Sequence, residues 1–422
     1  MARIRLALIL IIFILISPLI LKAEEVSLTL DEAIAIALRD NRDVLLRAED
    51  VKKAKEKIAE AQSSLFPTLT FTGGWTDTRG IYTKDSSQTA TQATLKQYLY
   101  KGGKIINTIE QNKDKLAVSS ALFDKTKLDV VLNVQKAFYT LLLAEEFTHL
   151  NKGIVDNTRQ HLNSQEARYQ DGQASESDIL KIKESLSSVD EAYQASLNQV
   201  EASQELLRDL LYLSKDLQIT PRAQFSYEPK DIAYDEGFLK AMQKRPEIRQ
   251  YEAQEKADKK AIEITKADNR PSIYASWDYY SRSHVSATAT RNRNDYNVLG
   301  LTFSWPIFDG WATKAKVEQA IIDLKATRLL KEKVTKDIAL ELKNAYLDLK
   351  NAIARLNSMQ AEIEVYKNAL SVIEKKYKAG IASSLDLDDV SLGYAVSLFN
   401  QKLADYDYIL AKAGFDKATG GM

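Results

Sequence analysis

Two short acidic segments carry the residues whose spacing could do chemistry. Residues 376–392 read KYKAGIASSLDLDDVSL, and residues 168–180 read RYQDGQASESDIL. In each segment a glycine ends a helical pattern and a serine begins the next one, with an aspartate three residues later. The glycines are Gly172 and Gly380, the serines Ser175 and Ser383, and the aspartates Asp178 and Asp386.

Two interpretations of these segments are open. In the first, each serine caps a helix and the following aspartate complements the positive end of the helix dipole, which accounts for Asp178 and Asp386 but does not require Asp389. In the second, Asp386 and Asp389 also act together, because residues three apart lie on adjoining parts of one helix face.

Other candidate chemistry is sparse. The three histidines are His149, His161 and His284, and we expect them at the surface rather than as metal ligands. Gly102 and Gly103 lie between a strand pattern and a helix pattern, but the G-x-x-x-x-G-K-[ST] phosphate loop is missing. No serine, histidine and aspartate arrangement stands out. We therefore expect no enzyme, no metal site and no cofactor.

The amino terminus resembles a secretory signal. Arg3 and Arg5 precede an apolar run at 6–21, and Ala23 offers a cleavage site. An uncleaved anchor is disfavoured because the run is shorter than the roughly 20 residues of a spanning helix. With residues 1–23 removed, 55 basic residues face 58 acidic ones, which argues against nucleic-acid binding. The chain has no cysteine, so disulfides and thiolate metal sites are excluded.

Features of the first half recur in the second half at a spacing of 208 residues, except that residues 65–67 recur at a spacing of 204 as residues 269–271. The matched residues include Tyr169 with Tyr377, Gly172 with Gly380 and Gly102 with Gly310. We therefore expect a duplicated chain with a first structural repeat at 24–213, a linker at 214–234 and a second structural repeat at 235–422.

Each repeat is expected to contain a helix, a β-hairpin, a very long helix, a glycine turn and a return helix. Glycine and proline are too scarce, at 15 and 7 residues, for many short elements. Each very long helix would span about 100 Å. The helical patterns cover 29–65, 104–170 and 176–213 in the first repeat, and 235–268, 312–378 and 384–417 in the second.

The β-hairpins, at about 66–100 and 271–308, show aromatic and apolar residues on alternate positions. Leu69, Phe71 and Trp75 alternate with threonines, while the polar segments 80–89 and 283–296 are expected to be loops. Four strands of roughly ten residues match tilted membrane-spanning strands. Four strands cannot close a barrel, so several chains must contribute. The residues expected at the strand junctions are Pro67, Pro271, Pro306, Gly102 and Gly310.

Together these features resemble the TolC family of outer-membrane efflux proteins. The resemblance rests on the export signal, the duplicated halves, the proline-started strands, the Phe308-Asp309-Gly310 element before a long helix, and the two Y-x-x-G turns. It covers essentially the whole mature chain. It implies a mostly α fold with a small β part: a homotrimer with a 12-stranded transmembrane β-barrel, four strands per chain, above a coiled-coil tunnel of duplicated α-helical hairpins.

The resemblance also implies a function and partners. Such proteins are channel-tunnels for efflux or type I secretion across the periplasm and the outer membrane, and they work with a periplasmic adaptor (membrane fusion protein) and an inner-membrane efflux pump or ABC exporter. Asp386 and Asp389 match the family's constriction aspartates, and Tyr377 and Asp178 match a latch pair. Ala382 stands where a latch arginine is expected.

One alternative function stays open at this stage, a non-conducting periplasmic coiled-coil tether or adaptor. Such a protein would show one helical hairpin flanked by globular β-domains. Two hairpins, each with its own aromatic strands, favour the channel.

Overall fold

The structure, a computed structural model, describes residues 25–80, 86–172, 175–223, 225, 233–286, 291–379 and 381–421. The expected signal peptide and Gly380 lie outside the described residues. The described part is mainly helical and contains two small sheets. None of its helices combines the length and the apolar character needed to cross a membrane.

The chain forms two compact units, each assembled from separated segments. Unit 1 contains Met1–Asn41, Val130–Pro229 and Asn351–Leu410. Unit 2 contains Arg42–Asp129, Lys230–Lys350 and Ala411–Met422. Three long helices, α4 (Lys104–Gln170), α8 (Ala312–Lys378) and α9 (Ser384–Ala418), contribute residues to both units.

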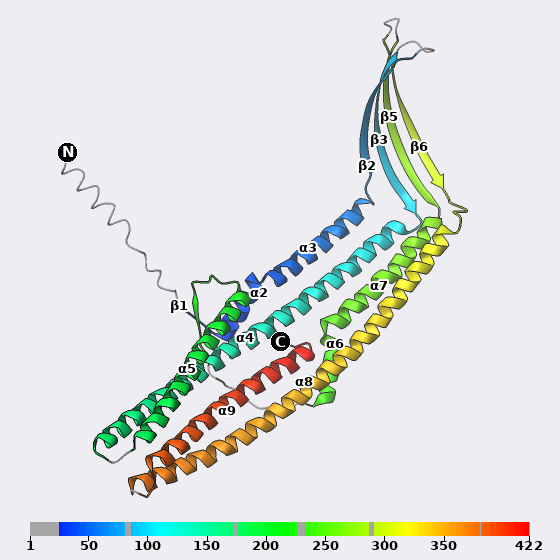
Figure 1. The fold of residues 1–422 in the computed structure, drawn as a ribbon. Coiled ribbons are helices and arrows are strands. Elements are labelled where there is room, and N and C mark those ends of the chain that lie inside the picture. Colours follow the sequence, from blue (N-terminus) through cyan, green and yellow to red (C-terminus); the bar gives the residue numbers. More distant parts are fainter. Residues whose placement is uncertain are drawn as a thin grey trace, which may run out of the picture. The chain divides into compact units, whose positions relative to one another are not determined.

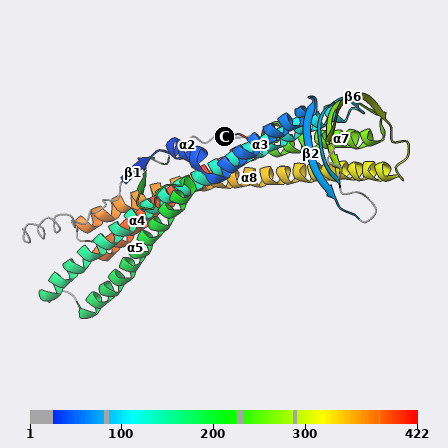
Figure 2. The same cartoon turned by 90° about the horizontal axis from the view of Figure 1, so that it is seen from above.

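Four long helices dominate the chain. They are α4 (Lys104–Gln170), α5 (Glu176–Leu211), α8 (Ala312–Lys378) and α9 (Ser384–Ala418). α8 contains no glycine or proline and α4 contains only Gly153, so nothing in either sequence interrupts the backbone hydrogen bonds. Figures 1 and 2 both show α4 and α5 side by side as a hairpin.

Both short helical segments are broken, which corrects the expectation of one continuous helix in each. The first segment forms α2 (Leu30–Asp40) and α3 (Arg42–Ser63), and the second forms α6 (Tyr234–Lys244) and α7 (Pro246–Lys266). A 3-10 turn, η1 (Ala267–Asn269), follows α7. Pro246 occupies the first position of α7, where its missing N–H costs nothing. That proline was the overlooked signal, whereas the first segment has no proline at its break.

The residues at the two breaks, Asn41 and Arg245, are both buried, and each donates a hydrogen bond to a carbonyl near the end of a return helix. Asn41 Nδ2 donates to the carbonyl of Leu210, 3.2 Å away, in the last turn of α5. Arg245 Nη1 donates to the carbonyl of Lys417, also 3.2 Å away, in the last turn of α9. The final carbonyls of a helix lack partners within the helix, so each break satisfies one of them.

A short parallel pair was not expected from the sequence. β1 (Glu25–Leu28) pairs with β4 (Gln218–Pro221) and lies within unit 1. It ties the start of the described chain to the segment after α5.

The larger sheet has four antiparallel strands in the order β2-β3-β5-β6, as Figure 1 shows. Its strands are longer than the ten residues expected, and most of the two polar segments taken for loops belongs to them. The polar residues of these segments continue the strand pairing, so the backbone hydrogen bonds of the sheet extend beyond its apolar part. Residues 81–85 and 287–290 lie outside the described residues. The strands are β2 (Thr68–Thr78), β3 (Ser86–Lys101), β5 (Ser272–Ser286) and β6 (Arg291–Ser304).

The two faces of this sheet differ in chemistry. One face is apolar and exposed: Phe71 is 73% exposed and Leu299 is 82% exposed. On the opposite face, Asp278 accepts hydrogen bonds from Thr94 at 2.6 Å and from Gln92 at 3.1 Å. Such cross-strand polar contacts stabilise this sheet, whose apolar face is exposed in the described part of the chain.

Gln97 is the polar exception on the apolar face. Its Nε2 donates to the carbonyl of Leu65, 3.1 Å away, and to the carbonyl of Tyr98, 2.9 Å away. The Gln97 amide thus provides a hydrogen-bond donor for a backbone carbonyl after the end of α3, so Gln97 does not disrupt the strand.

Prolines and glycines lie at the junctions between helices and strands. Pro67 directly precedes β2, Pro271 directly precedes β5, and Pro306 lies between β6 and α8. Gly102 and Gly310 both have positive φ, at 60° and 68°. Only at Gly102 would an added Cβ also clash, because it would lie 2.7 Å from the Cβ of Arg270.

Replacing Arg245 by alanine should destabilise the protein strongly. Its side chain is 5% exposed and pairs with Glu341 at 2.7 Å and Glu247 at 3.0 Å, so the substitution would leave carboxylates without their partner. Loss of one partner from a buried pair costs about 3 kcal/mol. The measurement is the thermal unfolding midpoint of the purified protein. Arg249→Ala is the control, since Arg249 is 51% exposed and exposed pairs contribute about 1 kcal/mol or less. Equal losses in the two variants would contradict this account.

Candidate functional site

The turn between α4 and α5 is built by a serine cap. Gly172 takes a positive φ of 72°, which favours glycine, and the chain then enters α5. Ser175 is the N-cap: it accepts from the backbone N–H of Asp178 at 3.2 Å, and its hydroxyl donates to the Asp178 carboxylate at 2.8 Å. The acidic segment at 168–180 therefore contains a helix cap.

The turn before α9 repeats this cap with one further hydrogen bond. The backbone N–H of Ser383 donates to the Asp386 carboxylate at 2.9 Å, and the Ser383 hydroxyl donates to the same oxygen at 2.7 Å. These hydrogen bonds lower the pKa of Asp386 below its ordinary value, since they favour the ionised carboxylate. Asp386 is exposed and stays charged at neutral pH.

Asp389 takes no part in this cap. It is exposed on α9, three residues beyond Asp386. Capping therefore explains Asp386 and leaves Asp389 without a structural role in the turn.

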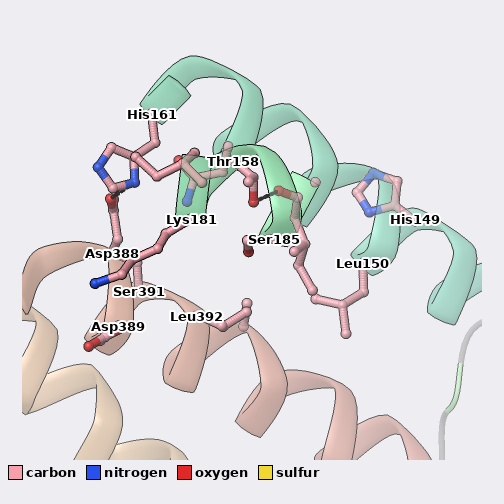
Figure 3. Close-up of a pocket in the computed structure, with 15 residues that line it drawn as sticks. His149, Leu150, Thr158, His161, Lys181, Ser185, Asp388, Asp389, Ser391 and Leu392 are labelled. Atoms are coloured by element: carbon pink, nitrogen blue, oxygen red, sulfur yellow. Dashed lines mark hydrogen bonds and ion pairs between the residues drawn. The ribbon is translucent and has the colours of Figure 1, made fainter. Parts of the chain in front are cut away.

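Asp388 was missed by the sequence analysis, and His161 was placed wrongly at the surface. The His161 side chain is 16% exposed, and its Nδ1 lies 3.1 Å from Oδ2 of Asp388, which is 30% exposed (Figure 3). The contact joins α4 to α9 within unit 1. His161 and Asp388 come from different hairpins, so the periodicity of a single helix could not predict that they are in contact.

The contact lies beside a groove of about 630 Å³ lined by α4, α5 and α9. In Figure 3, Asp388 points toward His161, whereas the Asp389 carboxylate points away from the imidazole. Burial raises the pKa of Asp388; His161 opposes this rise and Asp389 adds to it. Other residues of the groove are His149, Leu150, Thr158, Lys181, Ser185 and Leu392.

The expected latch residues are not joined by a hydrogen bond in the described part of the chain. Tyr377 is 41% exposed near the end of α8. The Asp178 carboxylate accepts from Ser175 instead. Their role as a latch stays a prediction.

Comparison with known proteins identifies the family. The model of the outer membrane efflux protein family matches residues 33–211 and 239–421. Outer membrane protein TolC of Escherichia coli (strain K12) is 21% identical over 406 residues, covering 90% of this chain and 80% of TolC. The chain belongs to the outer membrane efflux protein family.

Solved structures of outer membrane efflux proteins have the same fold. The open state of the Neisseria gonorrhoeae MtrE outer membrane channel superposes with a TM-score of 0.77 at 20% identity, covering 93% of this chain and 89% of MtrE. CusC superposes with a TM-score of 0.76 at 16% identity, covering 93% of this chain and 92% of CusC. Membership of this efflux family makes the chain an outer-membrane transport component and not an enzyme.

Ser383→Ala should weaken the start of α9. Loss of a serine N-cap costs about 1 kcal/mol. The pKa of Asp386 should also rise toward that of an ordinary aspartate, because the substitution removes the hydroxyl hydrogen bond that is the largest cause of the lowered pKa, while the backbone N–H of residue 383 still donates. A lowered pKa stabilises the folded turn above the ordinary aspartate range, and this stability is lost as the pH falls through the folded pKa.

Hydrogen exchange of a peptide covering 384–392 measures this effect. Exchange should be faster in Ser383→Ala than in the wild type at pH 7, and the difference should shrink only below the ordinary aspartate range, once the wild-type carboxylate also protonates. Ser391→Ala is the control because it lies in the same helix outside the cap. Equal acceleration in both variants would show that the cap is not the cause.

Proposed function

We propose that three copies of this chain form a channel-tunnel through which substrates leave the cell across the periplasm and the outer membrane. The observation that carries the proposal is the four-stranded sheet, with one exposed apolar face and an edge strand on either side. Lipid would cover the apolar face, and neighbouring chains would cover the edges.

The edges require more than one chain in the proposed barrel. Within the described residues, β2 and β6 each have one neighbouring strand. Lipid offers no water to their free N–H and C=O groups, so a membrane-spanning sheet must close on itself. Four strands are too few to close, whereas three chains supply twelve, within the range of known barrels.

The internal duplication supports a symmetric closure. Thr68 pairs with Lys96 in the first hairpin, and Ser272 pairs with Ser304 in the second. The two hairpins are thus equivalent, and the equivalent hydrogen bonds at Asn41 and Arg245 extend the match to the helices. We propose structural repeats at 24–213 and 235–422, joined by a linker at 214–234.

The helical hairpins would continue the channel as a tunnel. On α8, apolar residues recur in alternating steps of four and three, and several of them are buried, as expected for coiled-coil packing. The buried residues of this set are Ile338, Leu342, Leu349, Ala352 and Leu356. A path out of the cell must also cross the inner membrane, so a periplasmic adaptor and an inner-membrane efflux pump or ABC exporter would complete it.

The proposed constriction is formed by Asp386 and Asp389. Both are exposed at the start of α9, and two carboxylates from each of three chains would give a ring of six. Like charges in a narrow pore raise the local cation concentration. Tyr377 and Asp178 would restrain the closed state, and Ala382 supplies no arginine to help them.

The purified protein should be a trimer by native mass measurement and should conduct in planar bilayers. Its pore should prefer cations and be blocked by multivalent cations. Asp386→Ala combined with Asp389→Ala should weaken this block by about tenfold or more, because removing six charges removes the cation site. Glu176→Ala is the matched control, since it removes an exposed carboxylate from the first turn of α5, outside the proposed constriction and latch.

A monomer without conductance would overturn the channel proposal. A conducting trimer whose selectivity and block are unchanged in the double variant would leave capping as the only role of Asp386.

A further inference from the structure

We infer that the contact between His161 and Asp388 positions the start of α9, and with it the proposed constriction, and that the protonation of His161 controls the strength of this contact. The inference rests on the proposed role of Asp386 and Asp389. It assigns a positioning role to two residues that lie outside the expected constriction and latch.

The contact joins two hairpins of one chain. His161 lies on α4 of the first hairpin and Asp388 on α9 of the second. Their 3.1 Å separation is that of an ion pair, yet Asp388 Oδ2 has no hydrogen-bond partner among the described residues, so the contact lacks the geometry of a directed hydrogen bond. Its strength therefore depends mainly on the charges of the two groups, which attract more strongly when partly buried.

The surroundings of His161 can accommodate both of its protonation states. Its Nε2 lies 3.3 Å from the side-chain amide of Gln165. That amide can present its N–H groups to a neutral ring nitrogen, or turn its oxygen toward a protonated one. Protonation thus changes the attraction to Asp388 without leaving a ring nitrogen unpaired.

Charged groups from all three helices face this contact. Lys181 on α5 and Asp389 on α9 line the same groove, as does His149 on α4. Lys183 pairs with Glu166 at 3.0 Å, so this cation is already matched. Among these side chains, histidine is the type that most readily changes its charge between pH 5 and 8.

The position of Asp388 explains how the contact acts on the constriction. Asp388 is adjacent to Asp389 and two residues from Asp386, so holding it against α4 fixes the orientation of both on the first turns of α9. When His161 loses its proton, the attraction weakens and three neighbouring carboxylates repel one another. The arrangement of α9 in this structure should then be least stable at alkaline pH.

The pH range follows from the two groups. Burial raises the pKa of Asp388, so its carboxylate becomes neutral earlier on acidification than an ordinary aspartate. The restraint should weaken on acidification once the Asp388 carboxylate becomes neutral, and on a rise in pH once the imidazole ring is neutral.

Hydrogen exchange tests the contact without requiring channel activity. At pH 6, a peptide covering 381–392 should exchange roughly fivefold faster in His161→Gln than in the wild type, and the difference should largely vanish at pH 8. His149→Gln is the matched control, because it removes an exposed histidine from the same helix and groove. Trimer formation by native mass measurement confirms that both variants assemble.

Single-channel recording tests the consequence for the constriction. The wild-type open fraction should change severalfold from pH 6 to pH 8, that of His161→Gln should be the same at both pH values, and the combination with Asp388→Asn should behave like either single variant. Burial raises the pKa of Glu145 to about 7, so Glu145→Gln serves as a second control and should keep the wild-type response.

The outcomes separate the contact from the channel. Exchange in His161→Gln equal to the wild type at pH 6, or equal acceleration in His149→Gln, overturns the inference. The expected exchange result with no conductance in any variant would support the contact and overturn the channel proposal. An unchanged pH response of a conducting His161→Gln channel would overturn the role of the contact in positioning the constriction.

Discussion

The backbone hydrogen bonds along the outer edges of β2 and β6 are the constraint on which the proposed assembly depends. The sheet presents an apolar face, yet within the described residues each edge strand has only one neighbour. In water such edges would invite aggregation, and in lipid they would leave N–H and C=O groups unsatisfied. Closure with other copies removes both problems. In the proposed assembly the long helices and their turns would meet around one axis, and the exposed aspartates of the chains would form a ring.

The two halves of the chain solve the same local problems with different residues. Asn41 and Arg245 each break a helix and donate to a carbonyl near the end of a return helix. Ser175 and Ser383 each cap the helix after a turn. The differences between the halves are therefore more informative than the similarities. Asp388 and Asp389 follow the second cap, and this is where the His161 contact and the proposed constriction lie.

The sequence predicted the long helices and the caps well, because their signals are local. Serine and aspartate at a spacing of three predict a cap, and scarce glycine and proline predict long helices. The break at Asn41 was missed because it is fixed by a carbonyl from α5, 169 residues away in the chain. The same limit applies to His161 and Asp388. A histidine in a helix looks exposed until the helix that packs against it is known, and the periodicity of one segment does not reveal that partner.

The pairing of β6 with β2 of a neighbouring chain is the most direct test of this account. Lys96 of β3 pairs with Ser276 of β5. The second hairpin repeats the first with Ser272 in the place of Thr68 and Ser304 in the place of Lys96. By this correspondence Ser276 matches Thr72, so the same register between chains places Ser304 opposite Thr72 of the neighbour. The chain has no cysteine, so Thr72→Cys with Ser304→Cys should give disulfide-linked dimers and trimers on a denaturing gel after mild oxidation. Thr72→Cys with Phe303→Cys, which places the second thiol on the opposite face, should remain monomeric. Failure of Thr72→Cys to cross-link with cysteine at 300, 302 or 304 would contradict closure of the sheet between chains.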